Sequence, residues 1–176
     1  MNSRLLNPLL ALVLTLALPA CKDQHPGHDH GKPGDAKKEA AHKHEHTPPH
    51  GGAPVVLGDE EFHLEFVREA AAGKLQLYVL DGHLDKFVRI AVPAIEVTST
   101  IGGVLQTLAF QPVANPATGE KVGDTSLFEA QADWLKTATN FDAVVKLVDV
   151  KGKAFKDVKF NFPKGNEAEA ALSAKK

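Results

Sequence analysis

Sulfur-containing side chains are almost missing from this chain of 176 residues, which has one cysteine, Cys21, and one methionine, Met1. One cysteine cannot form a disulfide within the chain, so the fold has no such support. Sites that hold copper(I) through clusters of cysteine or methionine are excluded for the same reason. A metal bound by this chain must therefore be held by imidazole nitrogen and carboxylate oxygen.

An excess of charge of one sign is also missing. The 20 Lys and Arg residues and 22 Asp and Glu residues give a formal charge of −2, or −3 (19 minus 22) once Arg4 is removed with a leader. This balance, without a basic patch, does not favour nucleic-acid binding. The catalytic motifs GxSxG, HExxH, GxxxxGK[ST] and GxGxxG are absent too. We therefore expect a binding protein and not an enzyme.

The most apolar run, residues 5–18, follows Arg4 and has the character of a signal-peptide core. It is shorter than the roughly 20 apolar residues that a transmembrane helix needs. The run ends in LPAC, residues 18–21, which resembles the lipobox of bacterial lipoproteins. That resemblance implies cleavage before Cys21 and lipidation of this residue. The alternative is an ordinary secretory signal followed by a free thiol.

Lipidation of Cys21 would determine where the protein resides. Several acyl chains on one residue anchor a protein firmly to a membrane surface. In proteobacterial lipoproteins an aspartate after the cysteine is the usual signal for retention in the inner membrane, and here that position is Lys22. We therefore expect a lipid-anchored protein of the cell envelope, held at the outer membrane and facing the periplasm.

Histidine is concentrated between the cysteine and residue 50. This segment lacks Leu, Ile, Val and aromatic residues and is broken by several prolines and glycines, so it cannot bury enough apolar surface to fold by itself. We predict that residues 21–49 form a disordered tether. Seven of the nine histidines of the chain lie here or at its end: His25, His28, His30, His42, His44, His46 and His50.

Two interpretations of this histidine tract remain open. Neutral imidazole is a common ligand of Zn(II), Cu(II), Ni(II) and Co(II), and closely spaced donors on a flexible chain favour exchangeable, poorly selective binding. Such binding would weaken below a pH of about 6.5, where imidazole is protonated. Alternatively, the tract is only a hydrophilic or pH-responsive spacer, and the following domain binds a protein partner without metal.

Beyond residue 50, short alternating runs are separated by turn residues about every ten positions, which predicts an antiparallel β-sandwich of seven to nine strands, immunoglobulin-like. In residues 62–66, Phe62, Leu64 and Phe66 share the predicted core face, and His63 and Glu65 share the polar face. Residues 132–140 are expected to form a helical turn or a loop. The predicted strands are 55–57, 62–67, 74–80, 87–92, 94–100, 104–110, 127–131, 141–150 and 154–162. The predicted organisation is a signal peptide (1–20), a tether (21–49), a β-domain (50–162) and a flexible tail (163–176).

Residues 50–82 carry a pattern of short motifs. These are HGG at 50–52, LGD at 57–59, FHLE at 62–65 and YVLD at 78–81. The pattern resembles a small periplasmic β-domain of bacterial lipoproteins that also forms the N-terminal domain of heavy-metal efflux adaptor proteins. The resemblance implies association with metal or with an envelope partner, such as a metal-efflux component. The helical hairpin and lipoyl-like segments of the adaptors are missing, so a role in the efflux duct is not implied.

Three histidines of the predicted domain are candidates for a fixed metal site. His50 lies at the entrance of the domain, His63 on a strand, and His83 in the loop DGHLD. If these elements meet, the three imidazoles and a carboxylate could form a zinc or copper(II) shell. The alternative, which we favour from the sequence, is that the three histidines are unrelated.

Overall fold

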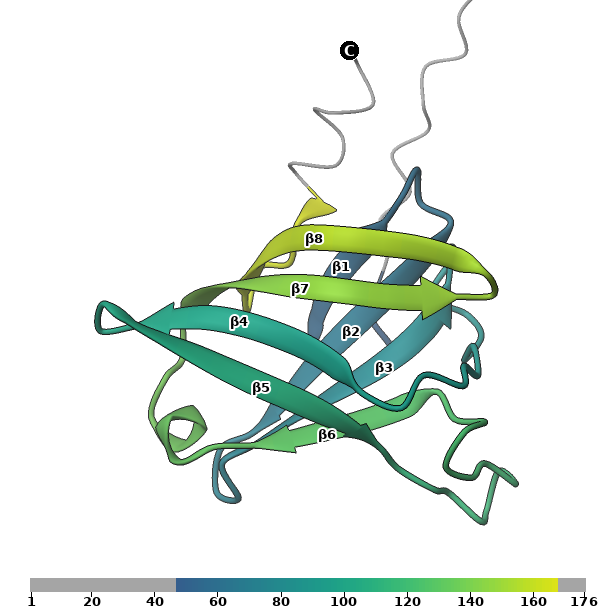
Figure 1. Ribbon diagram of the computed structural model, residues 1–176, viewed down its shortest axis with the longest axis horizontal. Helices are drawn as coiled ribbons and strands as arrows, with labels where there is room; N and C mark the ends of the chain where they lie inside the picture. Colours follow the sequence, from purple (N-terminus) through teal and green to yellow (C-terminus); the bar gives the residue numbers. More distant parts are fainter. Residues whose placement is uncertain (1–46, 168–176) are drawn as a thin grey trace, which may run out of the picture. The chain divides into compact units, whose positions relative to one another are not determined.

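The computed structural model describes residues 47–167, and these residues form an all-β unit (Figure 1). A short 3₁₀ helix, η1 (Asp133–Lys136), lies between the sixth and seventh strands. No helix within residues 47–167 is long and apolar enough to cross a membrane. The strands are β1 (Ala53–Leu57), β2 (Phe62–Glu69), β3 (Lys74–Asp81), β4 (Ile95–Ile101), β5 (Val104–Pro112), β6 (Leu127–Gln131), β7 (Phe141–Val150) and β8 (Lys153–Phe162).

All eight strands belong to one antiparallel sheet with the order β1-β2-β3-β6-β5-β4-β7-β8. The sheet folds over so that β7 and β8 lie across β1 and β2, which makes it nearly closed (Figure 1). Its two halves, β1-β2-β3-β6 and β5-β4-β7-β8, are joined by a short pairing of Gln111 and Pro112 in β5 with β6. The predicted all-β class and strand number are confirmed, and this arrangement is compatible with a sandwich.

The core lies between the two halves and follows the predicted alternation. Leu64 and Phe66 of β2 are fully buried, as are their neighbours on β3. The ring of Phe66 stacks on Phe160 of β8 with centroids 4.4 Å apart and meets Phe110 of β5 edge-on at 5.8 Å. One side chain thus packs against strands of the opposite half, and burying such a phenylalanine stabilises the fold by about 1.5–3 kcal/mol.

The gap between the edge strands β1 and β8 is covered by the residues that follow β8. The Asn166 side chain accepts a hydrogen bond from the Val56 N–H at 2.7 Å and donates one to the Val56 carbonyl at 3.2 Å. An amide side chain therefore satisfies the β1 backbone as a neighbouring strand would. The folded unit reaches beyond residue 162, where the sequence predicts the start of a tail.

One predicted strand is wrong. Residues 87–92 make only isolated bridges, from Phe87 to Leu80 and from Ile90 to Thr125. The segment contacts the end of β3 and then leaves it, so no continuous ladder forms. The predicted helical turn is confirmed as η1, and its Trp134 meets Phe141 edge-on at 5.1 Å.

Candidate functional site

Residues 50–52 are attached to β2 through a buried carboxylate. Glu65 is fully buried, and its Oε1 accepts hydrogen bonds from the backbone N–H groups of His50 at 2.8 Å and Gly52 at 2.9 Å. Its Oε2 lies 2.8 Å from Nδ1 of the His50 ring. Burying a carboxylate is costly unless it is hydrogen-bonded, and these three contacts provide the compensation.

The glycines after His50 make this close approach sterically feasible. Gly51 has a φ of +67°, a conformation that favours glycine. A Cβ atom on Gly52 would lie 2.5 Å from the Phe66 carbonyl oxygen and 2.8 Å from a methyl group of Val67. The HGG sequence is therefore explained by geometry: one glycine turns the chain and the next lets it lie against β2.

Two aromatic rings hold the other side of the imidazole. The His50 ring stacks on Tyr78 of β3 with centroids 4.0 Å apart and planes 18° apart. Phe87 lies tilted to both, 5.7 Å from His50 and 6.0 Å from Tyr78. Burial raises the pKa of Tyr78, and the nearby Glu65 charge raises it further, so the phenol stays neutral. We call His50, Glu65, Tyr78 and Phe87 the His50 cluster.

The cluster determines which ring nitrogen is available for a ligand. A carboxylate oxygen accepts hydrogen bonds, so Nδ1 of His50 is the ring nitrogen that donates to Oε2 of Glu65, 2.8 Å away. In the neutral ring with hydrogen on Nδ1, the Nε2 atom has a lone pair and no hydrogen. His50 keeps a side-chain exposure of 34%. In metal-binding histidines, one ring nitrogen commonly binds the metal while the other donates a hydrogen bond to a carboxylate, which orients the ring.

A cavity of about 510 Å³ adjoins the cluster and is lined in part by His50, Tyr78 and Phe87. Glu120, which is only 8% exposed, also lines the cavity. Burial raises the pKa of Glu120, but hydrogen bonds from Ser126 and Thr118 lower it by more, so the carboxyl stays ionised. The cavity therefore combines an aromatic wall with the Glu120 carboxylate, which pairs with Arg89 at 3.7 Å.

The sequence predicts that His63 lies on an exposed polar face, but the structure buries it. It is opposite the main core, as expected, but is fully buried, in register with Val56 of β1 and Leu80 of β3. Its Nδ1 lies 3.3 Å from the Asp81 carbonyl oxygen. The outer surface of β1-β2-β3 is therefore a second small buried layer, and His63 belongs to it.

His83 is exposed in the loop after β3 and does not approach the other two histidines closely enough to form a site. Its backbone N–H, with those of Asp85 and Lys86, donates to Oδ1 of Asp81 at 3.0–3.3 Å. Burial raises the pKa of Asp81, but these backbone bonds outweigh it and the pKa is lowered. Asp81 thus serves to shape the loop.

The candidate shell of His50, His63 and His83 with a carboxylate is not assembled in the described residues, in line with the favoured interpretation that these histidines are unrelated. Nowhere in residues 47–167 do three His, Cys, Asp or Glu side chains come together as a metal shell would require. The remaining predicted site residues lie outside the described part of the chain: Cys21, His25, His28, His30, His42, His44 and His46. His50 is thus the one predicted ligand that the described structure both orients and leaves partly exposed.

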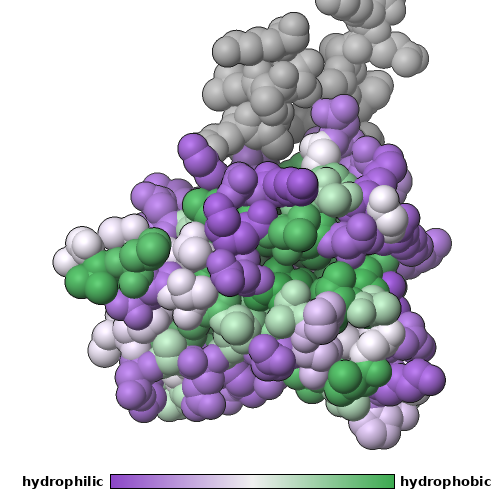
Figure 2. Space-filling model, in the orientation of Figure 1, coloured by the Kyte–Doolittle hydropathy of each residue, from purple (hydrophilic) through white to green (hydrophobic). Residues whose placement is uncertain are grey.

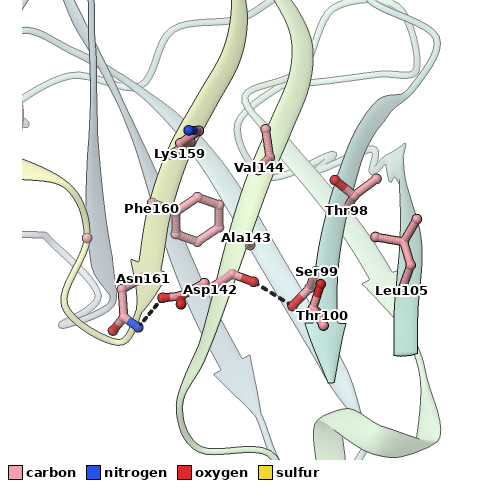
Figure 3. Close-up of a pocket in the computed structure, with 11 residues that line it drawn as sticks. Thr98, Ser99, Thr100, Leu105, Asp142, Ala143, Val144, Lys159, Phe160 and Asn161 are labelled. Atoms are coloured by element: carbon pink, nitrogen blue, oxygen red, sulfur yellow. Dashed lines mark hydrogen bonds between the residues drawn. The ribbon is translucent and has the colours of Figure 1, made fainter. Parts of the chain in front are cut away.

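A second hollow lies on the β5-β4-β7-β8 half and has a volume of about 630 Å³. Figure 3 shows that its lining side chains come from four neighbouring strands. Ser99 Oγ donates to the Asp142 carbonyl oxygen at 2.7 Å, and the Asn161 side chain donates to the Asp142 carboxylate at 2.8 Å. The buried Oδ1 of Asn161 has no hydrogen-bond partner among the described residues. No described histidine lines this hollow, so it gives less indication of a metal ligand than the His50 cluster does.

Sequence reasoning missed Glu65, Tyr78 and Phe87 as parts of the site. Glu65 stands on the polar face of an alternating strand, where a glutamate is ordinarily solvated. The motif HGG was noticed, but its partner lies 13 to 15 residues away on another strand. The sequence feature that could have identified Glu65 is an HGG motif followed by an alternating strand with one acidic residue among apolar ones.

No family model, curated protein or solved structure matches this chain.

Proposed function

We propose that this chain is a membrane-anchored extracytoplasmic lipoprotein that binds or buffers divalent transition metals through its histidine-rich segment, with His50 as the ligand fixed to the β-domain. The observation that carries the proposal is the 2.8 Å contact between His50 Nδ1 and the buried Glu65 carboxylate. This contact occupies Nδ1 and leaves Nε2 as the ring nitrogen for a metal. The chain acts by binding and does not catalyse a reaction.

The residues present fit a divalent metal of intermediate softness. Imidazole nitrogen suits Zn(II), Cu(II), Ni(II) and Co(II), and thiol or thioether ligands are not available beyond Cys21 and Met1. His46, His44 and His42 precede His50 by four, six and eight residues in the sequence. A chain of that length spans at most about 14–29 Å and can fold back on itself, so several imidazoles can reach one ion.

The fixed imidazole of His50 also lowers the entropy cost of metal binding compared with a tract that is flexible throughout. A flexible chain must lose conformational entropy when it closes around an ion. His50 has already been ordered by Glu65 and Tyr78, so a complex that includes it has a smaller ordering cost. We therefore expect one tighter site that contains His50 and several weaker ones along the tether.

The proposed location and partner rest on sequence features. The LPAC motif supports lipid attachment at Cys21, and Lys22 supports the outer membrane. The resemblance of residues 50–82 to the N-terminal domain of heavy-metal efflux adaptors supports an envelope partner in metal efflux. In this proposal the tether gathers ions near the membrane and the β-domain presents them to that partner.

Calorimetric titration of the unlipidated chain from residue 21, with Cys21→Ser, tests the proposal with Zn(II), Ni(II) and Cu(II). Deleting residues 22–46 should remove most of the bound equivalents. His50→Ala should remove the tightest site and leave the weaker ones, whereas His83→Ala, a change of an exposed histidine outside the cluster, should alter neither. Unchanged stoichiometry after the deletion would refute metal binding by the tether and favour a spacer for a protein-interaction domain.

A further inference from the structure

The hairpin formed by β4 and β5 projects from the rest of the sheet (Figure 1). An apolar surface covers its tip in the space-filling view (Figure 2). Val104 is 59% exposed and Leu105 is 68% exposed, among the largest exposures of apolar residues in the described chain. Exposed large aliphatic side chains gathered at one place often mark an interaction surface.

The backbone edge of β5 is open along this hairpin. On one side, Val104–Phe110 pair with β4 along their whole length. On the other side, only Gln111 and Pro112 pair with β6, and no described residue continues this pairing back to Val104. The two strands diverge there (Figure 1). An open edge can accept an additional strand.

The groups that point to the open side follow from strand alternation. Val113, just after β5, donates its N–H to Leu127 of β6 at 2.9 Å, so residues of odd number face the β6 side. Leu105, Thr107 and Ala109 therefore direct their N–H and C=O groups outward. Their side chains are exposed as well. The open edge thus offers three alternating residues with free backbone groups.

The edge lacks the features that usually protect such strands. Natural edge strands are commonly blocked by lysine, proline or inward-pointing charges. Here no charged residue occurs between Glu96 and Glu120, and the proline of β5 lies at its end, in the part paired with β6. A strand that pairs with this edge must itself be uncharged and able to form an extended ladder.

We propose that the open edge of β5 pairs with the same edge of a second copy, which forms an antiparallel dimer around a two-fold axis at Thr107. In this register Thr107 faces Thr107 of the second copy, and Leu105 faces Ala109 of the second copy. The three residues with outward backbone groups on each copy then satisfy one another. The exposed Leu105 packs over a small side chain, and no like charges meet.

The rest of this chain supplies no better occupant. Residues 21–46 contain no Val, Ile or aromatic residue and are rich in charge, proline and glycine, so they are poor strand formers. Residues 168–176 are alanine-rich and carry Glu169, Lys175 and Lys176. The contact area offered by one short strand is small, so we expect a weak and concentration-dependent dimer.

Sedimentation velocity on the unlipidated chain from residue 21, with Cys21→Ser, tests the dimer from about 1 µM to about 1 mM. The native surface should give a monomer–dimer equilibrium. Thr107→Lys should weaken it at least about tenfold by placing two ammonium groups opposite each other. Thr98→Lys is the matched control, because Thr98 faces Thr107 one strand inward. It should change dimerisation less than about twofold, and unchanged circular dichroism should show that both variants fold.

Oxidative cross-linking gives a second readout, because a disulfide traps a dimer that forms only transiently. In the same Cys21→Ser background, Thr107→Cys should form a disulfide-linked dimer and Thr98→Cys should not. The proposal is overturned if the protein is monomeric at every concentration and Thr107→Cys forms no disulfide-linked dimer. This holds also if the hairpin binds lipid vesicles instead. A dimer that persists in Thr107→Lys overturns it as well.

Discussion

The His50 cluster and the β4–β5 hairpin lie on opposite halves of one sheet and use polar groups in opposite ways. In the cluster, a fully buried glutamate accepts hydrogen bonds from two backbone N–H groups and contacts an imidazole that is stacked on an aromatic ring. Residues 97–112 of the hairpin carry no charge, and they expose Val104 and Leu105 together with an open strand edge. The comparison indicates that internal hydrogen bonds hold the His50 cluster in place, whereas the hairpin leaves apolar side chains and backbone groups exposed.

Removing the buried carboxylate should have the largest effect on stability. Glu65→Ala leaves the His50 and Gly52 donors without their acceptor and opens a small void, so we expect the free energy of unfolding to fall by about 2–4 kcal/mol. Glu96→Ala, on the exposed side of β4, should change it by no more than about 0.5 kcal/mol. Urea unfolding of the two variants measures the difference, and equal losses would contradict a special role for Glu65.

The two regions should also respond differently to a glycine substitution. Gly52→Ala places a Cβ against the Phe66 carbonyl oxygen and should cost about 2–3 kcal/mol. Gly102→Ala, at the hairpin tip, meets no atom within 4 Å and is disfavoured only by its φ of +58°, so it should cost about 1 kcal/mol. Thermal unfolding compares them, and a larger loss in the hairpin would show that the cluster is not closely packed.

Alkaline pH should weaken the cluster selectively. The pKa of Tyr78 is raised above the ordinary value of 10.0 by burial and by the Glu65 charge. Because the folded-state pKa is the higher one, this contribution to stability is complete below pH 10 and is lost as the pH rises through the folded-state pKa. Tyr78→Phe should abolish this part of the alkaline dependence. An unchanged pH profile of stability in the variant would contradict the assignment.

Changing the exposed surface of the hairpin should have the smallest effect on folding. Leu105→Ser removes a side chain that is 68% exposed, so stability should change by no more than about 0.5 kcal/mol at low protein concentration. Leu108→Ser, on the buried side of the same strand, should destabilise the fold by several times more. Urea unfolding distinguishes them, and a large loss at position 105 would mean that this side chain packs within the fold.

The fold could be predicted from the sequence wherever alternation coincides with burial. Leu64 and Phe66, and Leu75, Leu77 and Val79, were assigned to the core from period-two patterns and are fully buried. The pattern failed at residues 87–92, where an apolar run contacts two strands briefly and is not part of either ladder. Short apolar runs do not show by themselves whether a neighbouring strand is available.

The candidate site was only partly predictable, for a related reason. His50 was identified because it ends the histidine tract, but His63 was placed on an exposed face that is in fact buried. Glu65 was not predicted to act at all. Its role depends on the return of residues 50–52 across β2, a tertiary contact that requires two glycines and leaves no periodic signal in the sequence.

The central claim, that Glu65 orients His50 so that Nε2 can bind a metal, is tested most directly by long-range proton–nitrogen NMR of the His50 ring. In metal-free protein, the hydrogen of the neutral ring should be on Nδ1, the nitrogen that faces Glu65. Substoichiometric zinc should shift the Nε2 resonance before that of His83, and Glu65→Gln should weaken this response. A ring that carries its hydrogen on Nε2 and does not respond to zinc would contradict the account.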